Sequence, residues 1–94
     1  MSLTFEWDEA KAEESLIKHK VSFEEASTVF YDPLSISASD DEHSTGENRF
    51  IDIGLSSRQR LLVVVYTQRG QNMRIISSRK ATRHERTAYE KECI

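Results

Sequence analysis

Basic side chains are concentrated near the C-terminal end of this 94-residue chain, in the stretch NMRIISSRKATRHERTAYEK that begins at residue 72. Its cations are Arg74, Arg79, Lys80, Arg83, Arg86 and Lys91. Arginine presents a planar fork of donors that binds carboxylate or phosphate oxygens through two parallel hydrogen bonds and does not lose its charge. This stretch therefore predicts a surface that binds an anionic partner.

The charge of the whole chain is acidic, with a formal net charge of −3. Residues 1–47 hold three basic and twelve acidic residues, for −9, whereas residues 48–94 hold ten basic and four acidic ones, for +6. Such a split fits a scaffold with complementary faces. It also fits a local basic surface that steers a polyanion while the molecule stays acidic overall. Charge alone leaves both interpretations open.

The first half of the chain contains two predicted helices. Asp8 is a suitable N-cap for a helix over residues 9–19, and the apolar stripe of this helix is narrow. That stripe consists of Ala10, Ala12, Leu16 and Ile17. Ser22 and Glu25 have the spacing of a capping box for a second helix, which Asp32-Pro33 ends. This second helix presents Phe23, Ala26, Val29 and Phe30 on one face, so we expect it to pack in the core.

After Pro33 the apolar residues recur with a period of two, which is typical of strands. Residues 49–79 read as an antiparallel meander of three strands, with residues 34–39 paired at one edge and residues 5–7 as a possible further edge strand. The polar stretch 37–48 predicts the longest loop. We therefore expect an α+β fold with two N-terminal helices, a sheet of about four strands and a C-terminal helix.

The C-terminal helix is expected to begin at Thr82, which forms a second capping box with Glu85. It offers little apolar surface beyond Ala88 and Tyr89. A helix normally keeps its place by burying an apolar stripe, so polar contacts or a partner should hold this one.

Size and composition are those expected of one domain spanning residues 1–94. The single cysteine, Cys93, cannot form an intrachain disulfide, which favours a reducing compartment such as the cytoplasm. No apolar run approaches the ~20 residues that cross a bilayer, and no secretory signal is evident.

Five blocks of sequence resemble the BrnT family of toxins from type II toxin-antitoxin systems. In order, they read WDxxKAxxxxxKH from Trp7, VSFEEAxxVFxDP from Val21, HxxGExR from His43, IGLSSRxRLLVVVxT from Ile53 and RIISxRxAxxxExxxY from Arg74. Together these blocks cover almost all of residues 5–90. The resemblance implies a RelE-like fold and a ribonuclease that blocks translation. It also implies a cognate antitoxin with a ribbon-helix-helix region, through which alone the complex would contact DNA.

Two positions depart from the usual family pattern. Lys20 stands where a glycine would close the first helix in a left-handed conformation, at a backbone cost of ~1 kcal/mol if that geometry is kept. Ser78 replaces an alanine and leaves the arginines on both sides in place.

Cleavage of RNA by its own 2′-hydroxyl needs a base, donors for the charge on the phosphate and an acid for the leaving oxygen, but no metal or other cofactor. Arg49, Arg74 and Arg79 are the candidates for phosphate contact. Arg74 and Arg79 have opposite strand parity unless the strand ends or bulges between them. We expect them to meet near the strand end, together with Tyr89, at one concave, positively charged site.

Four further side chains are candidates for the chemistry. Glu85 and Tyr89 are four residues apart, on one helix face. Glu85 either orients an arginine or only caps the helix. Tyr89 either donates a proton or stacks on a base, or else only anchors the helix. His19 suits acid-base work near neutral pH, although histidines at helix ends are common without function. Glu47 is either a base or an ion-pair partner of Arg49.

Other cations are candidates for binding the RNA backbone rather than for catalysis. These are Lys18, Lys20, Lys80, Arg83 and Arg86. The acidic loop around His43 does not match a known metal-ligand spacing, so no metal site is predicted.

Three interpretations of function remain open. The first is the ribonuclease toxin. The second retains the fold without catalysis, as a binding module that docks a DNA-binding antitoxin. The third is a small housekeeping α+β domain unrelated to toxins.

Overall fold

A computed structural model of the chain describes residues 3–40 and 48–92. The elements are β1 (Thr4–Trp7), α1 (Glu9–His19), α2 (Phe23–Thr28), a 3-10 turn η1 (Val29–Tyr31), β2 (Ile36–Ser39), β3 (Phe50–Leu55), β4 (Leu61–Arg69), β5 (Asn72–Lys80) and α3 (Arg83–Glu92). The predicted α+β class and the order of helices and strands are confirmed. The stretch around His43 and Glu47 lies outside the described residues.

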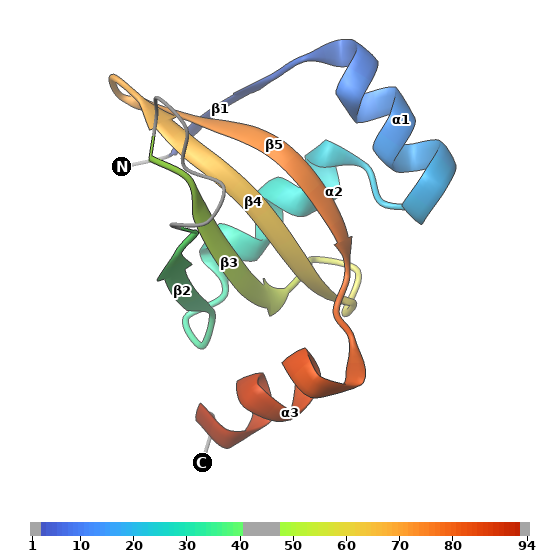
Figure 1. Cartoon of the computed structure of the whole chain (residues 1–94), viewed down its shortest axis with the longest axis vertical. Helices are drawn as coiled ribbons and strands as arrows, with labels where there is room; N and C mark the ends of the chain where they lie inside the picture. The colour runs from blue at the N-terminus through green and yellow to red at the C-terminus, as the bar shows by residue number, and fades with distance from the viewer. Residues whose placement is uncertain (1–2, 41–47, 93–94) are drawn as a thin grey trace.

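The five strands form one sheet in the order β1-β5-β4-β3-β2 (Figure 1). All neighbours are antiparallel except β1 and β5, which are parallel, so the sheet is mixed. The expected meander and the edge strand β2 are present, and residues 4–7 form the other edge. β1 pairs only with the first part of β5, from Asn72 to Ile75. Beyond Ile75, the outer edge of β5 is left for another element.

One face of the sheet carries the main core. Val21, Phe23, Ala26 and Val29 pack there against the central strands, where Leu62, Val64 and Ile75 are fully buried. The second helix is shorter than predicted, because residues 29–31 tighten into the turn η1. Gly54 allows this close approach: a Cβ atom there would lie 2.8 Å from Val29 Cγ1 and 2.9 Å from Ser35 Cβ.

The first helix buries a different side from the one that its apolar residues indicate. Leu16 and Ile17 are 50% and 67% exposed, whereas Ser15 is buried. Ser15 Oγ lies 3.1 Å from the carbonyl oxygen of Ser78 and 3.0 Å from that of Val21, so its single proton can be donated to either. Of the residues in the apolar stripe, Ala12 packs against the core, whereas Leu16 and Ile17 face solvent. This helix is held against the sheet by the packing of Ala12 on the core and by the polar contact of Ser15 with the edge of β5.

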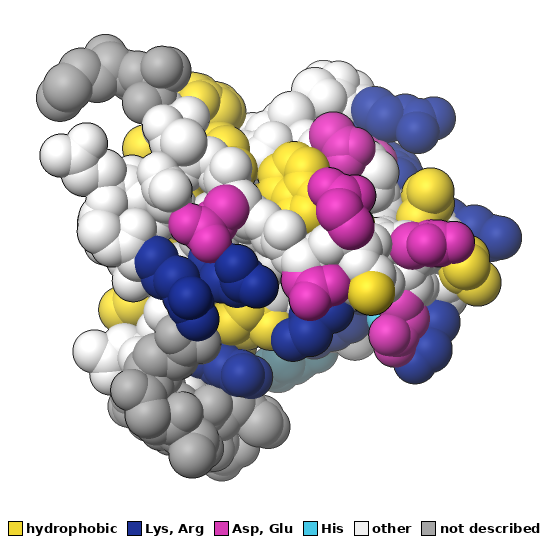
Figure 2. Space-filling model, turned by 90° about the horizontal axis from the view of Figure 1, so that it is seen from above, with side chains coloured by type: hydrophobic (Ala, Val, Ile, Leu, Met, Phe, Trp, Pro, Cys, Tyr) yellow, Lys and Arg dark blue, Asp and Glu magenta, His cyan; other side chains and the backbone are white. Residues whose placement is uncertain are grey.

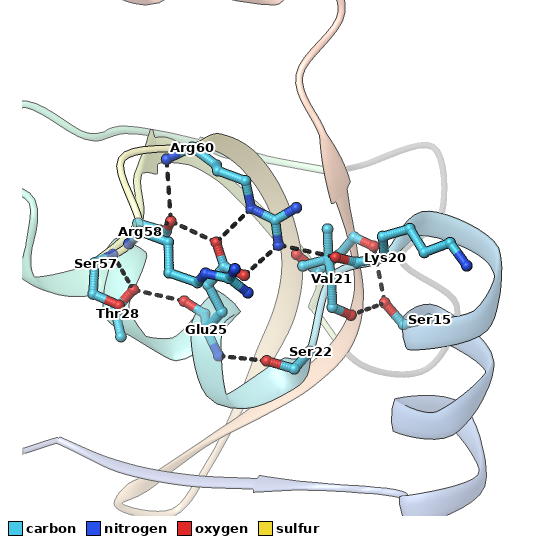
Figure 3. Close-up of polar contacts among 11 residues, drawn as sticks. Ser15, Lys20, Val21, Ser22, Glu25, Thr28, Ser57, Arg58 and Arg60 are labelled. Atoms are coloured by element: carbon cyan, nitrogen blue, oxygen red, sulfur yellow. Dashed lines mark hydrogen bonds and ion pairs between the residues drawn. The ribbon is translucent and has the colours of Figure 1, made fainter.

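The end of α1 is held by an ionic cluster (Figure 3). Lys20 adopts the left-handed conformation, with φ 59° and ψ 31°, and its N–H donates to the carbonyl oxygen of Leu16. Arg60 Nη2 donates to the Lys20 carbonyl oxygen at 2.9 Å, and the same guanidinium contacts both carboxylate oxygens of Glu25. The lysine thus keeps the geometry that glycine would adopt.

Glu25 makes only half of the predicted capping box. Its N–H donates to Ser22 Oγ at 3.0 Å, but its buried carboxylate accepts from Arg60 and from Ser56 Oγ. The hydrogen bond from Arg60 is the main reason why the pKa of Glu25 is lowered.

In the part of the chain that the structure describes, no helix is long and apolar enough to cross a membrane.

Candidate functional site

A basic hollow lies between α1 and β5, with a volume of about 370 Å³. We call this site the α1/β5 hollow. It is lined by Lys11, Glu14, Ser15, Lys18, His19, Phe23, Arg49, Ile76, Ser77 and Ser78. It exists because β1 ends opposite Ile75, so that α1 instead of a strand flanks the rest of β5.

The charge of the α1/β5 hollow is mainly positive. Lys11, Lys18 and Arg49 line it, and Glu14 is the one carboxylate among its described lining residues. Glu14 accepts from Lys18 Nζ at 2.8 Å, and this hydrogen bond lowers the pKa of Glu14 and raises that of Lys18. Both side chains of this pair are exposed, so water screens it and a stronger anion can displace the carboxylate.

In Figure 2, lysine and arginine side chains gather towards the lower edge of the face. His19 is exposed at the end of α1, eight residues after Lys11 and one after Lys18. Residues 11, 15, 18 and 19 share one side of a helix with 3.6 residues per turn. An anion in the α1/β5 hollow can therefore contact Lys11 and Lys18 of the helix and Arg49 next to β3. The imidazole of His19 lines the same hollow.

The three candidate arginines share one face of the sheet because β5 contains a bulge. Val65 is opposite Ser77 but Tyr66 is opposite Ile75, so Ile76 has no residue opposite it. This extra residue places Arg74 and Arg79 on the same side, opposite Thr67 and Val63. Thr67 and Val63 are four residues apart, so at about 3.3 Å a residue the two arginines lie about 13 Å apart along the sheet. Arg49 directly precedes β3, whose register continues towards Thr67.

The expected meeting of these arginines with Tyr89 at one concave site is wrong. Of the three arginines, only Arg49 lines the α1/β5 hollow. Arg74 Nη1 donates to Glu6 Oε2 at 2.8 Å, next to the start of the chain. Arg79 is paired with Glu85 at the other end of β5.

Glu85 performs both of the functions considered for it. It accepts from Arg79 Nη1 and Nη2 at 2.8 Å each, and from the Thr82 N–H at 2.8 Å, while its own N–H donates to Thr82 Oγ1 at 3.2 Å. The hydrogen bonds from Arg79 are the largest cause that lowers the pKa of Glu85 to about 2. This carboxylate therefore caps α3 and holds Arg79 in place.

Tyr89 anchors α3 to the turn before β2. Its hydroxyl donates to Asp32 Oδ2 at 2.7 Å, and the same carboxylate accepts from the N–H groups of Leu55 and Leu34. Burial acts to raise the pKa of Asp32, but these hydrogen bonds outweigh it and the pKa is lowered. Of the described side chains of α3, only Glu85 and Tyr89 are partly buried, and both make polar contacts. The sequence predicted that polar contacts or a partner hold this helix, and the structure shows the polar contacts.

The other predicted RNA contacts are spread over the surface. Lys20, Lys80, Arg83 and Arg86 are exposed, and none of these four lines the α1/β5 hollow. Lys80 is opposite Leu62, on the face of the sheet that carries the core. Arg83 and Arg86 lie on α3, which projects from the end of the sheet opposite the β4–β5 turn (Figure 1).

Seven of the ten residues that line the α1/β5 hollow were not among the sequence-based candidates, and Lys11 and Ser77 are two of these. Lys11 could have been found, because it lies seven residues before Lys18 and so on the same side of the helix. Ser77 could not, since its position depends on the bulge at Ile76. Among the described residues, no group of three or more His, Cys, Asp or Glu side chains is arranged to hold a metal ion.

Comparison with known proteins gives a family and a fold. A family profile described as the ribonuclease toxin BrnT of type II toxin-antitoxin systems matches residues 7–85. The crystal structure of the Brucella abortus ribonuclease toxin BrnT superposes with a TM-score of 0.66 at 19% sequence identity, covering 87% of this chain and 100% of that one. No curated protein sequence matches at a significant level.

Proposed function

Since the chain belongs to the BrnT family of type II toxin-antitoxin ribonuclease toxins, we propose that it cleaves RNA in the α1/β5 hollow and thereby inhibits translation. The observation that carries this assignment is the convergence of Lys11, Lys18, His19 and Arg49 in one concave site. A single-stranded RNA backbone is held by a positively charged groove of this kind.

The side chains of the hollow suit cleavage by the 2′-hydroxyl of the RNA. Arg49 can place two parallel N–H donors on the scissile phosphate, and Lys11 supplies a further positive charge. His19 is the residue of the site that can carry a proton to or from the reacting oxygens. The reaction needs no metal, because guanidinium and ammonium groups offset the charge that grows on the phosphate.

The arginines outside the hollow are assigned to RNA binding along β5. Arg74 and Arg79 lie on the same face of the sheet as Arg49 and bracket Ser77, which lines the hollow. Arg79 uses two N–H groups for Glu85 and another for the Lys80 carbonyl oxygen, which leaves donors for a phosphate. Glu85 positions Arg79, and Tyr89 fixes α3 through Asp32.

A non-catalytic role remains the second candidate, and one observation favours it. Arg74, Arg79 and Tyr89 are all engaged with acidic groups of the same chain. In that case the protein acts as a module that docks an antitoxin with a ribbon-helix-helix region, and contacts DNA only through this partner.

Under the first proposal the antitoxin neutralises the ribonuclease in the cytoplasm, where the single cysteine stays reduced.

Controlled expression in a bacterium, with and without the adjacent reading frame, tests whether the chain is a toxin that this neighbour neutralises. The expected result is growth arrest that co-expression of the neighbour relieves. Growth that continues at the rate of an empty-vector control would overturn the proposal.

A further inference from the structure

The first helix carries two surfaces of opposite charge. Residues 11, 14, 15 and 18 form one strip, which lines the α1/β5 hollow, and residues 9, 12, 13 and 16 form another. Corresponding members of the two strips are two residues apart, and so about 200° apart around the helix axis. The second strip therefore faces away from the α1/β5 hollow.

The second strip borders a groove between α1 and α2, with a volume of about 450 Å³. We call it the α1/α2 groove. Its lining residues are Glu9, Ala10, Ala12, Glu13, Leu16, Ser22, Phe23 and Glu24. Ala12 and Phe23 provide an apolar base, and Leu16 stands half exposed at the side. Towards the right of Figure 2, where α1 lies in Figure 1, apolar and acidic side chains lie side by side.

The chemistry of the α1/α2 groove indicates what binds there. Glu9, Glu13 and Glu24 are exposed, and none of the described residues lining the groove is Lys or Arg. Leu16, which lines the groove, is 50% exposed and its neighbour Ile17 is 67% exposed, so this part of α1 presents apolar side chains to solvent. A polyanion such as RNA is repelled by these carboxylates. A segment that fits must combine apolar side chains with a basic flank.

We infer that the α1/α2 groove is the docking site for a basic, amphipathic helix of the antitoxin. This inference rests on the proposed function for the existence of that partner. A helix that places apolar side chains on Ala12, Leu16 and Phe23 sets its flanking lysines or arginines against Glu9, Glu13 and Glu24. Helix α3 of a second copy is a poorer match, because its three basic residues are balanced by three acidic ones. It also offers only Ala88 and Tyr89 as apolar surface, and Tyr89 is engaged with Asp32.

The partner and the RNA thus occupy opposite sides of α1. Bound antitoxin would act on the α1/β5 hollow through the position of this helix, and not by filling the site. Ser15 links the helix to β5 and Ala12 packs against the core, so a change in the tilt of the helix moves Lys11, Lys18 and His19 together.

Charge reversal in the α1/α2 groove tests the inference. Glu13→Lys is compared with Glu90→Lys, which makes the same change of charge at an exposed position of α3. Binding of the purified product of the adjacent reading frame is measured by calorimetry at two salt concentrations. Glu13→Lys should weaken binding at least tenfold and reduce its salt dependence, while Glu90→Lys should bind like the unmodified protein. Both variants should cleave RNA at the unmodified rate.

Equal binding by the two variants would overturn the docking site while leaving the ribonuclease assignment intact. Failure of the unmodified protein to bind the neighbour would overturn the antitoxin partner itself. Sedimentation of the chain alone completes the test: self-association that Glu13→Lys abolishes would mean that a second copy occupies the groove, which also overturns the inference.

Discussion

Arg79 and Glu85 are joined by two parallel hydrogen bonds of 2.8 Å each, which connect the end of β5 to the first turn of α3. The same carboxylate completes the capping box with Thr82. With the bond from Tyr89 to Asp32, this pair sets the position of a helix that buries almost no apolar surface. The basic residues of α3 are therefore placed by polar contacts that pH and substitution can change.

Replacing Glu85 with glutamine should lower the free energy of unfolding at pH 7 by about 1 kcal/mol, because the charge-assisted bonds to Arg79 are weakened. The pKa of Glu85 is about 2 in the folded chain and 4.5 ordinarily, so its contribution is present above pH 4.5 and is lost as the pH falls towards 2. Urea unfolding at pH 7 and pH 3 measures this. Glu90→Gln is the matched control on the same helix, and an equal effect of both variants would contradict the assignment.

Replacing Lys20 with glycine should raise the free energy of unfolding by about 0.5–1 kcal/mol. The left-handed backbone conformation of residue 20 is strained for lysine, because lysine has a Cβ atom, and is unstrained for glycine. Thermal or urea unfolding measures the change. Lys18→Gly, inside α1, should have the opposite sign and cost about 1 kcal/mol. Destabilisation by Lys20→Gly would show that Lys20 makes contacts worth more than its backbone strain.

Replacing Asp52 with asparagine should stabilise the protein at pH 7–8. Asp52 is 2% exposed, and burial, helped by the charge of Asp32, raises its pKa to about 6. A carboxyl with a raised pKa binds its proton more tightly when folded. Its contribution is therefore full below pH 4 and is lost as the pH rises through 6.

We expect a gain of about 1–3 kcal/mol for Asp52→Asn at pH 8, and a flatter stability profile between pH 4 and 6. Chemical unfolding across that range measures both. A variant whose profile runs parallel to that of the unmodified protein would exclude Asp52 as the titrating group.

Much of the fold could be predicted because its signals are local. Asp8, Ser22 and Thr82 each cap the helix that their sequence context indicates, and the period of two after Pro33 indicates the strands. The exposure of Leu16 and Ile17 could not be predicted, since the position of α1 depends on a bond from Ser15 to a strand 63 residues away.

The candidate site was only partly predictable, for the same reason. Arg49 and His19 were identified by residue type, but their common hollow depends on where β1 ends. Arg74 and Arg79 lie on the same face of the sheet because of the bulge at Ile76, and no turn residue in the sequence indicates this bulge. The hydroxyl of Tyr89 donates a hydrogen bond to Asp32, which is 57 residues away in the chain, and the sequence around neither residue indicates that contact.

Cleavage of a single-stranded RNA by purified Arg49→Ala, in buffer with EDTA, tests the α1/β5 hollow as the ribonuclease site most directly. Arg83→Ala, on α3, is the matched control, and circular dichroism monitors folding of both variants. We predict that the unmodified protein and Arg83→Ala cleave at similar rates, and that Arg49→Ala is slower by about 100-fold, as for the loss of one donor to the transition state. Cleavage by folded Arg49→Ala at the unmodified rate would contradict the assignment.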